Sequence, residues 1–237
     1  YEYFLQAFSI NADKEEGEFY TPHSIVELIA TLVEPFDGKL YDPCCGSGGM
    51  FVQAARYMHE HNRSVDAKQA KEMLKFRCYG VEKEPDTVKL AKMNLLLNNV
   101  RGEITEANSF YADPYDAVGK FDYVMANPPF NMSEWGASRL ADDVRWKYGV
   151  PPEGNANYAW IQPMVHHLSP TGRIGLVLAN GSLTTTSGGE GDIRRRLIEA
   201  DLVEGVIAMP NQLFYNVSIP VCVWFFNRKK KNPGKVL

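Results

Sequence analysis

An asparagine stands directly after an apolar run near the middle of the chain. Residues 121–126 read Phe-Asp-Tyr-Val-Met-Ala, which is typical of a buried strand, and Asn127, Pro128, Pro129 and Phe130 follow at once. The tetrad therefore places an amide, a turn restricted by two prolines and an aromatic ring where a strand is expected to end. Together these three groups could hold a planar ring by its exocyclic amine.

A second loop at a predicted strand end, residues 42–49, reads Asp-Pro-Cys-Cys-Gly-Ser-Gly-Gly. Its glycines permit positive φ and close approach of a ligand to the backbone. A dinucleotide loop would show G-x-G-x-x-G with an acid ~20 residues further on, whereas the next strand-end acid here, Glu82, is about twice as far away. This favours a ligand with an amine for Asp42 and a ribose for Glu82. The alternative is a packing turn with a surface acid.

The order and spacing of the two loops indicate methyl transfer to an amino nitrogen. Apolar runs and helical periodicity alternate along the chain and predict an α/β fold with a doubly wound, mostly parallel seven-stranded sheet, covered on both faces. Ligands of such sheets bind at the carboxyl ends of the strands, where both loops lie. Strands are expected at 40–41, 78–82, 104–108, 121–126, 173–178, 203–208 and 219–226; helices at 50–60, 61–76, 85–97, 158–168 and 193–200; and a mobile loop at 133–155.

Composition limits the possible partners and compartment. The 237 residues suffice for one large domain, and the net charge of −4 is not that of a protein that grips nucleic acid alone. The basic clusters 194–196 and 228–231 are most simply a solvated helix face and a turn, with phosphate contact as the alternative. The four cysteines have no metal-ligand spacing and favour packed thiols in a reducing cytosol, and no apolar run is long enough to span a membrane, so a cytoplasmic location is expected.

The two loops resemble those of the amino-methylating DNA methyltransferases that use S-adenosylmethionine. Residues 17–23, Gly-Glu-Phe-Tyr-Thr-Pro-His, look like that family's additional cofactor motif, and their place ahead of the glycine loop matches the gamma group. More narrowly, the chain is similar to the methylation (M) subunit of type I restriction-modification systems. The resemblance covers nearly the whole chain, which begins at Tyr1 and is expected to be an excerpt of a longer one. The supporting segments are 1–5, 172–183, 210–216 and 219–220.

The resemblance implies a single methyltransferase domain over 1–237, with a cofactor-motif segment at 1–38 and the core sheet at 39–237. It implies double-stranded DNA as substrate, and as partners a specificity subunit, a restriction and motor subunit and a second copy of the M subunit. Thr21 would bind the carboxylate of S-adenosylmethionine, Glu82 its ribose and Asn108 its adenine amine. The cofactor residues are expected to be Glu18, Phe19, Tyr20, Thr21, Pro22, His23, Asp42, Gly46, Ser47, Gly48, Glu82 and Asn108.

The tetrad itself explains how an adenine amine could react. The side-chain oxygen of Asn127 and the carbonyl of Pro128 could each accept one amine hydrogen, which would localise the nitrogen lone pair without a metal. Phe130 would stack on the base, a contact of about 1–3 kcal/mol, after the base leaves the duplex. Phe214 and Tyr215 are weaker candidates for the opposite wall, with ordinary core aromatics as the alternative.

Other readings of the sequence remain open. The tetrad would equally suit a cytosine amine, RNA or a glutamine amide of a protein. A non-catalytic assembly subunit would keep the fold but is expected to lose Asn127 or the glycines, and both are present. His166 and His167 are expected to be surface or satisfied core residues.

Overall fold

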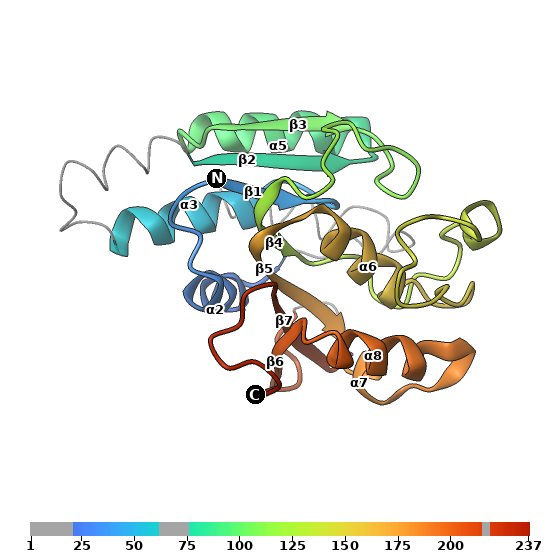
Figure 1. The fold of residues 1–237 in the computed structure, drawn as a ribbon. Coiled ribbons are helices and arrows are strands. Elements are labelled where there is room, and N and C mark those ends of the chain that lie inside the picture. The colour runs from blue at the N-terminus through green and yellow to red at the C-terminus, as the bar shows by residue number, and fades with distance from the viewer. Residues whose placement is uncertain (1–20, 62–75, 215–218) are drawn as a thin grey trace.

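A seven-stranded mixed sheet forms the centre of the molecule (Figure 1). The computed structural model describes residues 21–61, 76–214 and 219–237, and most of the helix expected at 61–76 lies outside these ranges. The strand order is β3-β2-β1-β4-β5-β7-β6. The first five strands pair in parallel, and β7 runs antiparallel to both β5 and β6. The strands are β1 (Lys39–Asp42), β2 (Arg77–Glu82), β3 (Gly102–Glu106), β4 (Phe121–Ala126), β5 (Leu168–Ala179), β6 (Val203–Ala208) and β7 (Val221–Asn227).

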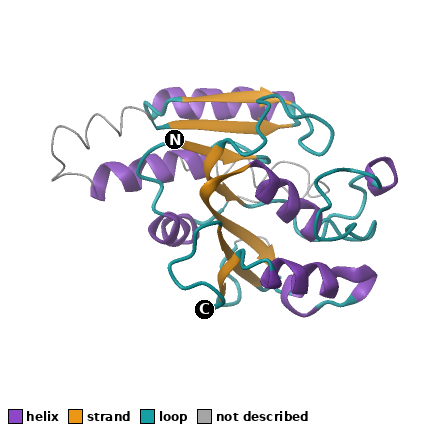
Figure 2. Cartoon of the chain, viewed as in Figure 1, coloured by secondary structure: helices purple, strands orange, loops and turns teal. Residues whose placement is uncertain are grey.

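Helices cover both faces of this sheet, which confirms the predicted doubly wound architecture (Figure 2). One face packs against α2, α3 and α5, and the other against α6 and α8. The buried residues form two hydrophobic cores, the first between the sheet and α2, α3 and α5, and the second between the sheet and α6 and α8. Successive side chains of a strand point to opposite faces, so in β1 Leu40 belongs to the first core and Tyr41 to the second. The helices are α2 (His23–Val33), α3 (Gly49–His61), α5 (Pro85–Leu97), α6 (Asn157–His167), α7 (Gly181–Thr184) and α8 (Glu190–Glu199), with 3₁₀ turns η1 (Ala137–Leu140) and η2 (Ser187–Gly189).

Three strands begin two or more residues away from the sequence expectation, and β3 covers 102–106 rather than 104–108. β7 begins at Val221 rather than at residue 219, because Pro220 has no N–H to give to a ladder; its carbonyl instead accepts from Asn180 N at 2.9 Å. β5 begins already at Leu168, where α6 ends. β5 and β7 are buried along most of their length, as expected for the centre of a sheet covered on both faces.

The strand order reverses between β1 and β4, which lie side by side. From β1 the chain continues into α3 on one face of the sheet, and from β4 it continues toward α6 on the other. The glycine loop follows β1 and the Asn-Pro-Pro-Phe tetrad follows β4. Both predicted motifs therefore lie at the switch point, where open α/β sheets bind their ligands.

The segment 133–155 is packed against the second core, where a mobile loop was expected. Trp135 is 1% exposed and its ring nitrogen donates to Pro152 O at 3.1 Å. Trp146 is buried beside it, with the two rings edge to face at 5.7 Å. The irregular backbone hides this packing from any search for a period. In the described part of the chain, every helix is too short or too polar to cross a membrane.

Candidate functional site

The catalytic candidate Asn127 has one polar end held and the other free. Its Nδ2 donates to Thr21 Oγ1 at 2.9 Å. Its Oδ1 is buried, and within residues 21–61, 76–214 and 219–237 no donor bonds to it. A buried acceptor without a donor is uncommon because it loses hydration without compensation. The arrangement therefore presents a carboxamide oxygen that is ready to accept a hydrogen.

The other three residues of the tetrad directly follow Asn127 in the sequence. Pro128 is buried, while Pro129 and Phe130 are half-buried. The Phe130 ring meets Phe214 edge to face, with ring centroids 5.6 Å apart and an interplanar angle of 90°. Phe214 is itself buried in the core, so it supports Phe130 rather than standing free as a second wall. Tyr215 lies outside the described residues.

The glycine loop turns as its composition predicts. Gly46 has φ +51° and Gly48 has φ +77°, both in the region that favours glycine. A Cβ on Gly46 would meet no atom of the described residues within 4 Å, so these residues leave this side of the loop open. A Cβ on Gly48 would come within 2.8 Å of Leu95 Cδ1, because α5 packs closely behind. Gly46 thus lies on the open side of the loop, and Gly48 on its packed side.

Glu82 links the end of β2 to this loop. Its Oε2 accepts from Gly46 N at 3.1 Å, and its Oε1 accepts from Glu84 N at 2.9 Å. Each carboxylate oxygen keeps a further lone pair, since an ionised carboxylate offers about four acceptor sites. Glu82 can therefore hold the loop and still accept from two hydroxyls.

Asp42 is a buried carboxyl group, 2% exposed. Its Oδ1 accepts from Cys44 N at 3.0 Å. The pKa of Asp42 is raised to about 7: burial is the largest cause and the negative charge of Glu82 adds to it, while the hydrogen bonds with Cys44 oppose the rise. A cation placed beside Asp42 would restore its ionised form. The residue types and the electrostatics thus suit a ligand with an ammonium group.

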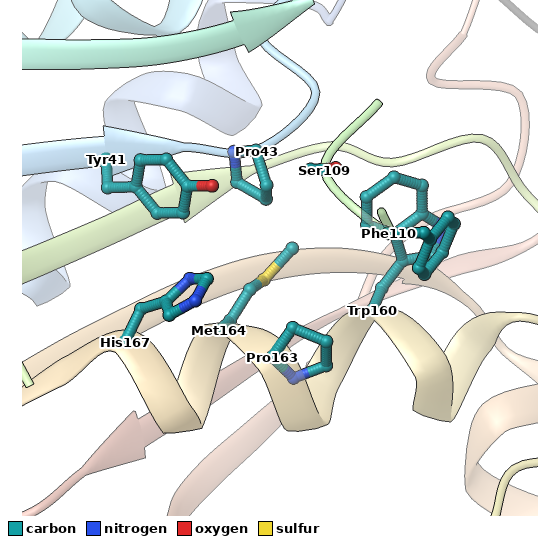
Figure 3. Close-up of a pocket in the computed structure, with 8 residues that line it drawn as sticks. All are labelled: Tyr41, Pro43, Ser109, Phe110, Trp160, Pro163, Met164 and His167. Carbon is teal, nitrogen blue, oxygen red and sulfur yellow. The ribbon is translucent and has the colours of Figure 1, made fainter. Parts of the chain in front are cut away.

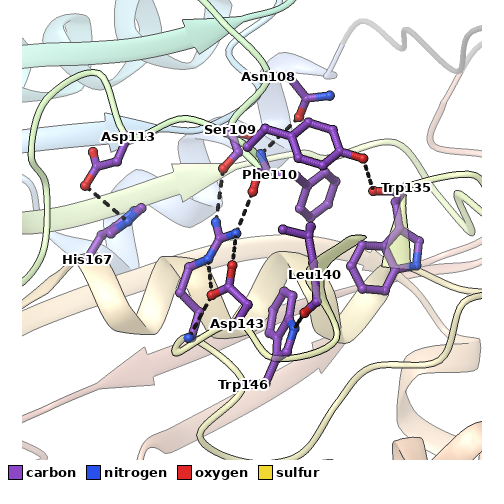
Figure 4. A network of polar contacts seen from close by, with 11 residues as sticks. Asn108, Ser109, Phe110, Asp113, Trp135, Leu140, Asp143, Trp146 and His167 are labelled. Atoms are coloured by element: carbon purple, nitrogen blue, oxygen red, sulfur yellow. Dashed lines mark hydrogen bonds and ion pairs between the residues drawn. The ribbon is translucent and has the colours of Figure 1, made fainter. Parts of the chain in front are cut away.

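The turn after β3, which contains Asn108, is held by the packed segment 133–155 (Figure 4). The Arg145 guanidinium donates to Ser109 O at 3.2 Å and to Phe110 O at 2.5 Å, and it forms a 2.7 Å ion pair with Asp143. Asn108 is exposed, and its Oδ1 accepts from Phe110 N at 3.0 Å. Asn108 therefore closes its own turn, with one lone pair of Oδ1 and its amide hydrogens left for a ligand.

A small pocket lies behind this turn, between β1 and α6 (Figure 3). Its free volume is about that of one water molecule, so it cannot hold a nucleobase. Its walls are Tyr41, Pro43, Ser109, Phe110, Trp160, Pro163, Met164 and His167.

The histidines of α6 play no visible part in the tetrad. His167 is 4% exposed, and burial lowers its pKa to about 4, so the ring is neutral near pH 7. His166 is half-buried, and burial lowers its pKa as well. Surface or satisfied core positions were expected for this pair; His167 lies in the core, but its Nδ1 has no partner among the described residues.

The remaining predicted cofactor residues precede or begin α2, and only some of them lie within the described residues. Pro22 is buried and precedes α2, where its carbonyl accepts from Ile25 N at 3.0 Å. His23 is exposed, and its Nδ1 lies 3.7 Å from Glu27 on the same helix. Glu18, Phe19 and Tyr20 lie outside the described residues. The structure thus brings Thr21 to Asn127, and Asp42 and Glu82 to the glycine loop.

Two polar residues near the site escaped the sequence analysis. Asn94, on the buried side of α5, donates from Nδ2 to Ser47 O at 2.9 Å and so anchors the glycine loop from behind. A polar residue among the apolar positions of a helix was the available signal. Asn157 lies at the start of α6, and its Nδ2 donates to Oδ1 of Asn131 at 3.5 Å. Asn131 directly follows the tetrad. The Oδ1 of Asn157 is buried and lacks a partner within the described ranges.

One residue of each basic cluster is less exposed than expected, while the other five are exposed: Arg195, Arg196, Arg228, Lys229 and Lys231. Arg194 is half-buried and donates to Ser182 O at 3.2 Å and Thr185 O at 2.8 Å, so the prediction of a solvated face is wrong for this residue. Lys230 is 3% exposed and pairs with Asp201 at 2.6 Å. The four cysteines are free thiols, and burial raises the pKa of each.

The fold and the site together define a class, that of seven-stranded α/β proteins of the methyltransferase type. The structure superposes on a type I restriction-modification system methyltransferase subunit from Streptococcus thermophilus with a TM-score of 0.82 and 30% identity, over 99% of this chain and 49% of that one. The chain belongs to the N-6 DNA methylase family, whose model matches residues 1–237.

Two curated relatives agree with this family. The type I restriction enzyme HindI methylase subunit of Haemophilus influenzae is 46% identical over the whole of this chain and 52% of its own length. The type I restriction enzyme MjaIX methylase subunit of Methanocaldococcus jannaschii is 42% identical, over the whole of this chain and 42% of its own length. The chain thus spans about half the length of the relatives it matches.

Proposed function

We propose that this chain is the catalytic part of a type I modification subunit that methylates the N6 amine of an adenine flipped out of double-stranded DNA, with S-adenosylmethionine as methyl donor. The observation that carries the proposal is the buried Oδ1 of Asn127, which has no donor among the described residues. Family membership and the names of the relatives support the same activity.

The chemistry follows from what the tetrad can accept. An adenine amine is a weak nucleophile because its lone pair is delocalised into the ring. Asn127 Oδ1 would accept one amine hydrogen and the Pro128 carbonyl the other, which localises the lone pair on the side away from both oxygens. A carboxamide is no base, so Asn127 orients the amine and leaves its proton to solvent. Phe130, supported by Phe214, would stack on the flipped ring.

The loop residues fit S-adenosylmethionine. When bound, this cofactor supplies an electrophilic methyl group on a positively charged sulfur. Asp42 would bind its ammonium group, and Glu82 its ribose hydroxyls, while the open side of Gly46 leaves room for it. Asn108 would face its adenine, and Thr21 its carboxylate. Glu18, Phe19, Tyr20, Pro22 and His23 remain predicted to line its methionine end.

The proposed partners follow from the negative net charge of the chain and from the names of its relatives. A net charge of −4 does not suit a protein that holds DNA alone. The relatives are named as subunits of type I restriction enzymes. We therefore expect a specificity subunit that selects the DNA sequence, a second M subunit, and a restriction and motor subunit that joins for cleavage.

A methylation assay tests this function. The full subunit, with its specificity partner, is incubated with unmethylated DNA and labelled S-adenosylmethionine, and the product nucleosides are separated. N6-methyladenine is expected. Asn127→Ala should abolish transfer and leave cofactor affinity near normal, while the exposed Asn232→Ala serves as the matched control.

Each rival has its own outcome. If the product is N4-methylcytosine, the substrate is cytosine rather than adenine. If label is found only in RNA or in protein glutamine, that molecule is the substrate instead of DNA. Normal cofactor binding without transfer to any of these would favour the assembly subunit. A large loss of cofactor affinity in Asn127→Ala would mean that this side chain serves the cofactor instead.

A further inference from the structure

The hydrogen bond between Asn127 and Thr21 joins two predicted parts of the site. It spans 106 residues of sequence, at 2.9 Å, from the catalytic tetrad to the segment before α2. Helix α2 gives Thr21 a firm base, because its first turn bonds to the Pro22 carbonyl and its apolar side is buried. Gly175 of β5 permits this close packing, since a Cβ there would come within 2.3 Å of Ile29.

The two ends of a carboxamide have opposite hydrogen-bonding character. With Nδ2 directed at Thr21, Oδ1 is left to accept from an amine. A half-turn of the amide would direct Nδ2 at that amine and set two donors against each other. The contact with Thr21 therefore matters only if Thr21 Oγ1 must accept rather than donate.

A hydroxyl group has one hydrogen and two lone pairs. Alone, Thr21 could either accept from Nδ2 or donate to Oδ1, so it would not fix the amide. A carboxylate accepts only, and it would take the hydroxyl hydrogen for itself. Thr21 Oγ1 would then have nothing but lone pairs to offer Asn127, and only the observed orientation would be left.

We propose that Thr21 is a positioning residue that couples cofactor binding to recognition of the target amine. This rests on the proposed function. The donors run in one direction, from the target amine to Asn127 Oδ1, from Asn127 Nδ2 to Thr21 Oγ1, and from the Thr21 hydroxyl to the cofactor carboxylate. A bound cofactor thereby turns Asn127 into an acceptor, and the amine in turn tightens cofactor binding, since such coupling is reciprocal.

The test measures this coupling by binding rather than by turnover. S-adenosylhomocysteine carries the carboxylate but no transferable methyl group. The affinity of the full subunit, with its specificity partner, is measured for target duplexes that contain either adenine or purine, which lacks the amine, with and without S-adenosylhomocysteine. In the wild type we expect the ligand to strengthen binding of the adenine duplex about tenfold more than binding of the purine duplex.

Three variants isolate the Thr21 hydroxyl. Thr21→Val should remove the tenfold difference and lower single-turnover methylation at least tenfold at saturating cofactor, whereas Thr21→Ser should restore both within threefold. Thr31→Val is the matched control, because Thr31 lies on α2 and its hydroxyl bonds to the Glu27 carbonyl at 2.7 Å. In an Asn127→Ala background, Thr21→Val should have no further effect on the coupling.

Several results would overturn the proposal. One is equal coupling in Thr21→Val and wild type, and another is a Thr21→Val defect that vanishes at saturating cofactor, which would make Thr21 a cofactor contact alone. If Thr21→Val does not fold, the wild type decides: equal strengthening of the adenine and purine duplexes rejects the coupling. A wild type that methylates no DNA would reject the proposed function and this inference with it, whereas methylation without coupling rejects this inference alone.

Discussion

Glu82 Oε2 accepts the N–H of Gly46 at 3.1 Å, so the acid at the end of β2 holds the loop at the end of β1. The strands that lead to these two residues, β1 and β2, are neighbours in the sheet. Gly46 can turn its N–H toward the acid because its φ is +51°, a conformation that costs other residues about 1–2 kcal/mol. Glu82, which is predicted to bind the cofactor ribose, and the predicted cofactor loop are thus joined to each other rather than being two separate contacts.

Glu82→Gln should weaken cofactor binding about 10- to 100-fold. A carboxamide has one acceptor oxygen where the carboxylate has two, so it cannot serve both Gly46 N and Glu84 N and still accept from a ligand. A hydrogen bond to a charged group contributes roughly 1.5–3 kcal/mol. Calorimetry with S-adenosylhomocysteine measures the loss. The exposed Glu103→Gln on β3 is the control, and an affinity within twofold of wild type would refute this role of Glu82.

Alanine at Gly46 and at Gly48 should have different effects. Both variants place a side chain at positive φ, at a cost of about 1–2 kcal/mol. At Gly48 the new Cβ would also push against Leu95, so unfolding stability should fall further, by about 1–3 kcal/mol in total. At Gly46 the Cβ points into open space, so the main loss should be cofactor affinity.

Denaturant unfolding and calorimetry separate the two effects. Gly119→Ala is the control, because Gly119 also has a positive φ, +68°, and a Cβ there meets no atom of the described residues within 4 Å, but it lies outside the glycine loop. Equal cofactor affinity in Gly46→Ala and Gly119→Ala would show that the open side of Gly46 is not the ligand side.

Cofactor binding should release protons near pH 6.5. Burial raises the pKa of Asp42 to about 7, so the carboxyl is largely protonated at that pH, and a bound ammonium group would favour the ionised form. Affinity should therefore rise from pH 6 to 7.5. Titration in buffers of different ionisation enthalpy measures the release. Asp42→Asn should abolish it, and unchanged release in that variant would assign the proton to another group.

Cofactor affinity should rise with pH, whereas the contribution of Asp42 to the stability of the cofactor-free protein should fall with pH. Its pKa in the folded protein, about 7, exceeds the ordinary 3.8, so the folded state binds the proton more tightly. The stabilisation from this proton is full below about pH 4 and is lost as the pH rises to about 7. Asp42→Asn should remove this contribution, so the stability difference between wild type and variant should depend on pH within this window only. A difference independent of pH from 4 to 7 would contradict the raised pKa.

The sheet and the strand-end loops could be predicted because their signals are local. The apolar run 121–126 is followed by Asn127 and two prolines, and the short apolar segment 40–41 is followed by the glycine-rich residues 42–49. Each loop therefore marks the end of the strand before it. The doubly wound sheet followed from the alternation of strands and helices. These features need no knowledge of long-range contacts.

The contacts that complete the site could not be predicted in this way. The bond from Asn127 to Thr21 depends on how α2 packs on β5, and neither residue's neighbours in sequence reveal it. Arg194 fits the exposed side of a helical pattern, yet its long side chain reaches the carbonyls of Ser182 and Thr185. Periodicity reports the direction of a Cβ atom, whereas a guanidinium group can bond several ångströms away from it.

Arg145→Lys should loosen the turn that carries Asn108. An ammonium group cannot reproduce the fork by which Arg145 reaches two carbonyls and Asp143 at once. Because the Arg145 and Asp143 side chains are 12% and 16% exposed, the free energy of unfolding should fall by about 2–3 kcal/mol. Cofactor affinity should fall as well if Asn108 faces the adenine, since its turn would no longer be held.

Two control variants separate the clamp from charge alone. Arg195→Lys changes an arginine whose ion pairs with Asp192 and Glu199 are exposed, so the stability of this variant should stay close to that of the wild type. Asp143→Asn keeps the bonds from Arg145 to the carbonyls of Ser109 and Phe110, so it should retain most of the cofactor affinity. If Asp143→Asn weakened cofactor binding as much as Arg145→Lys does, the ion pair rather than the grip on the two carbonyls would hold the turn.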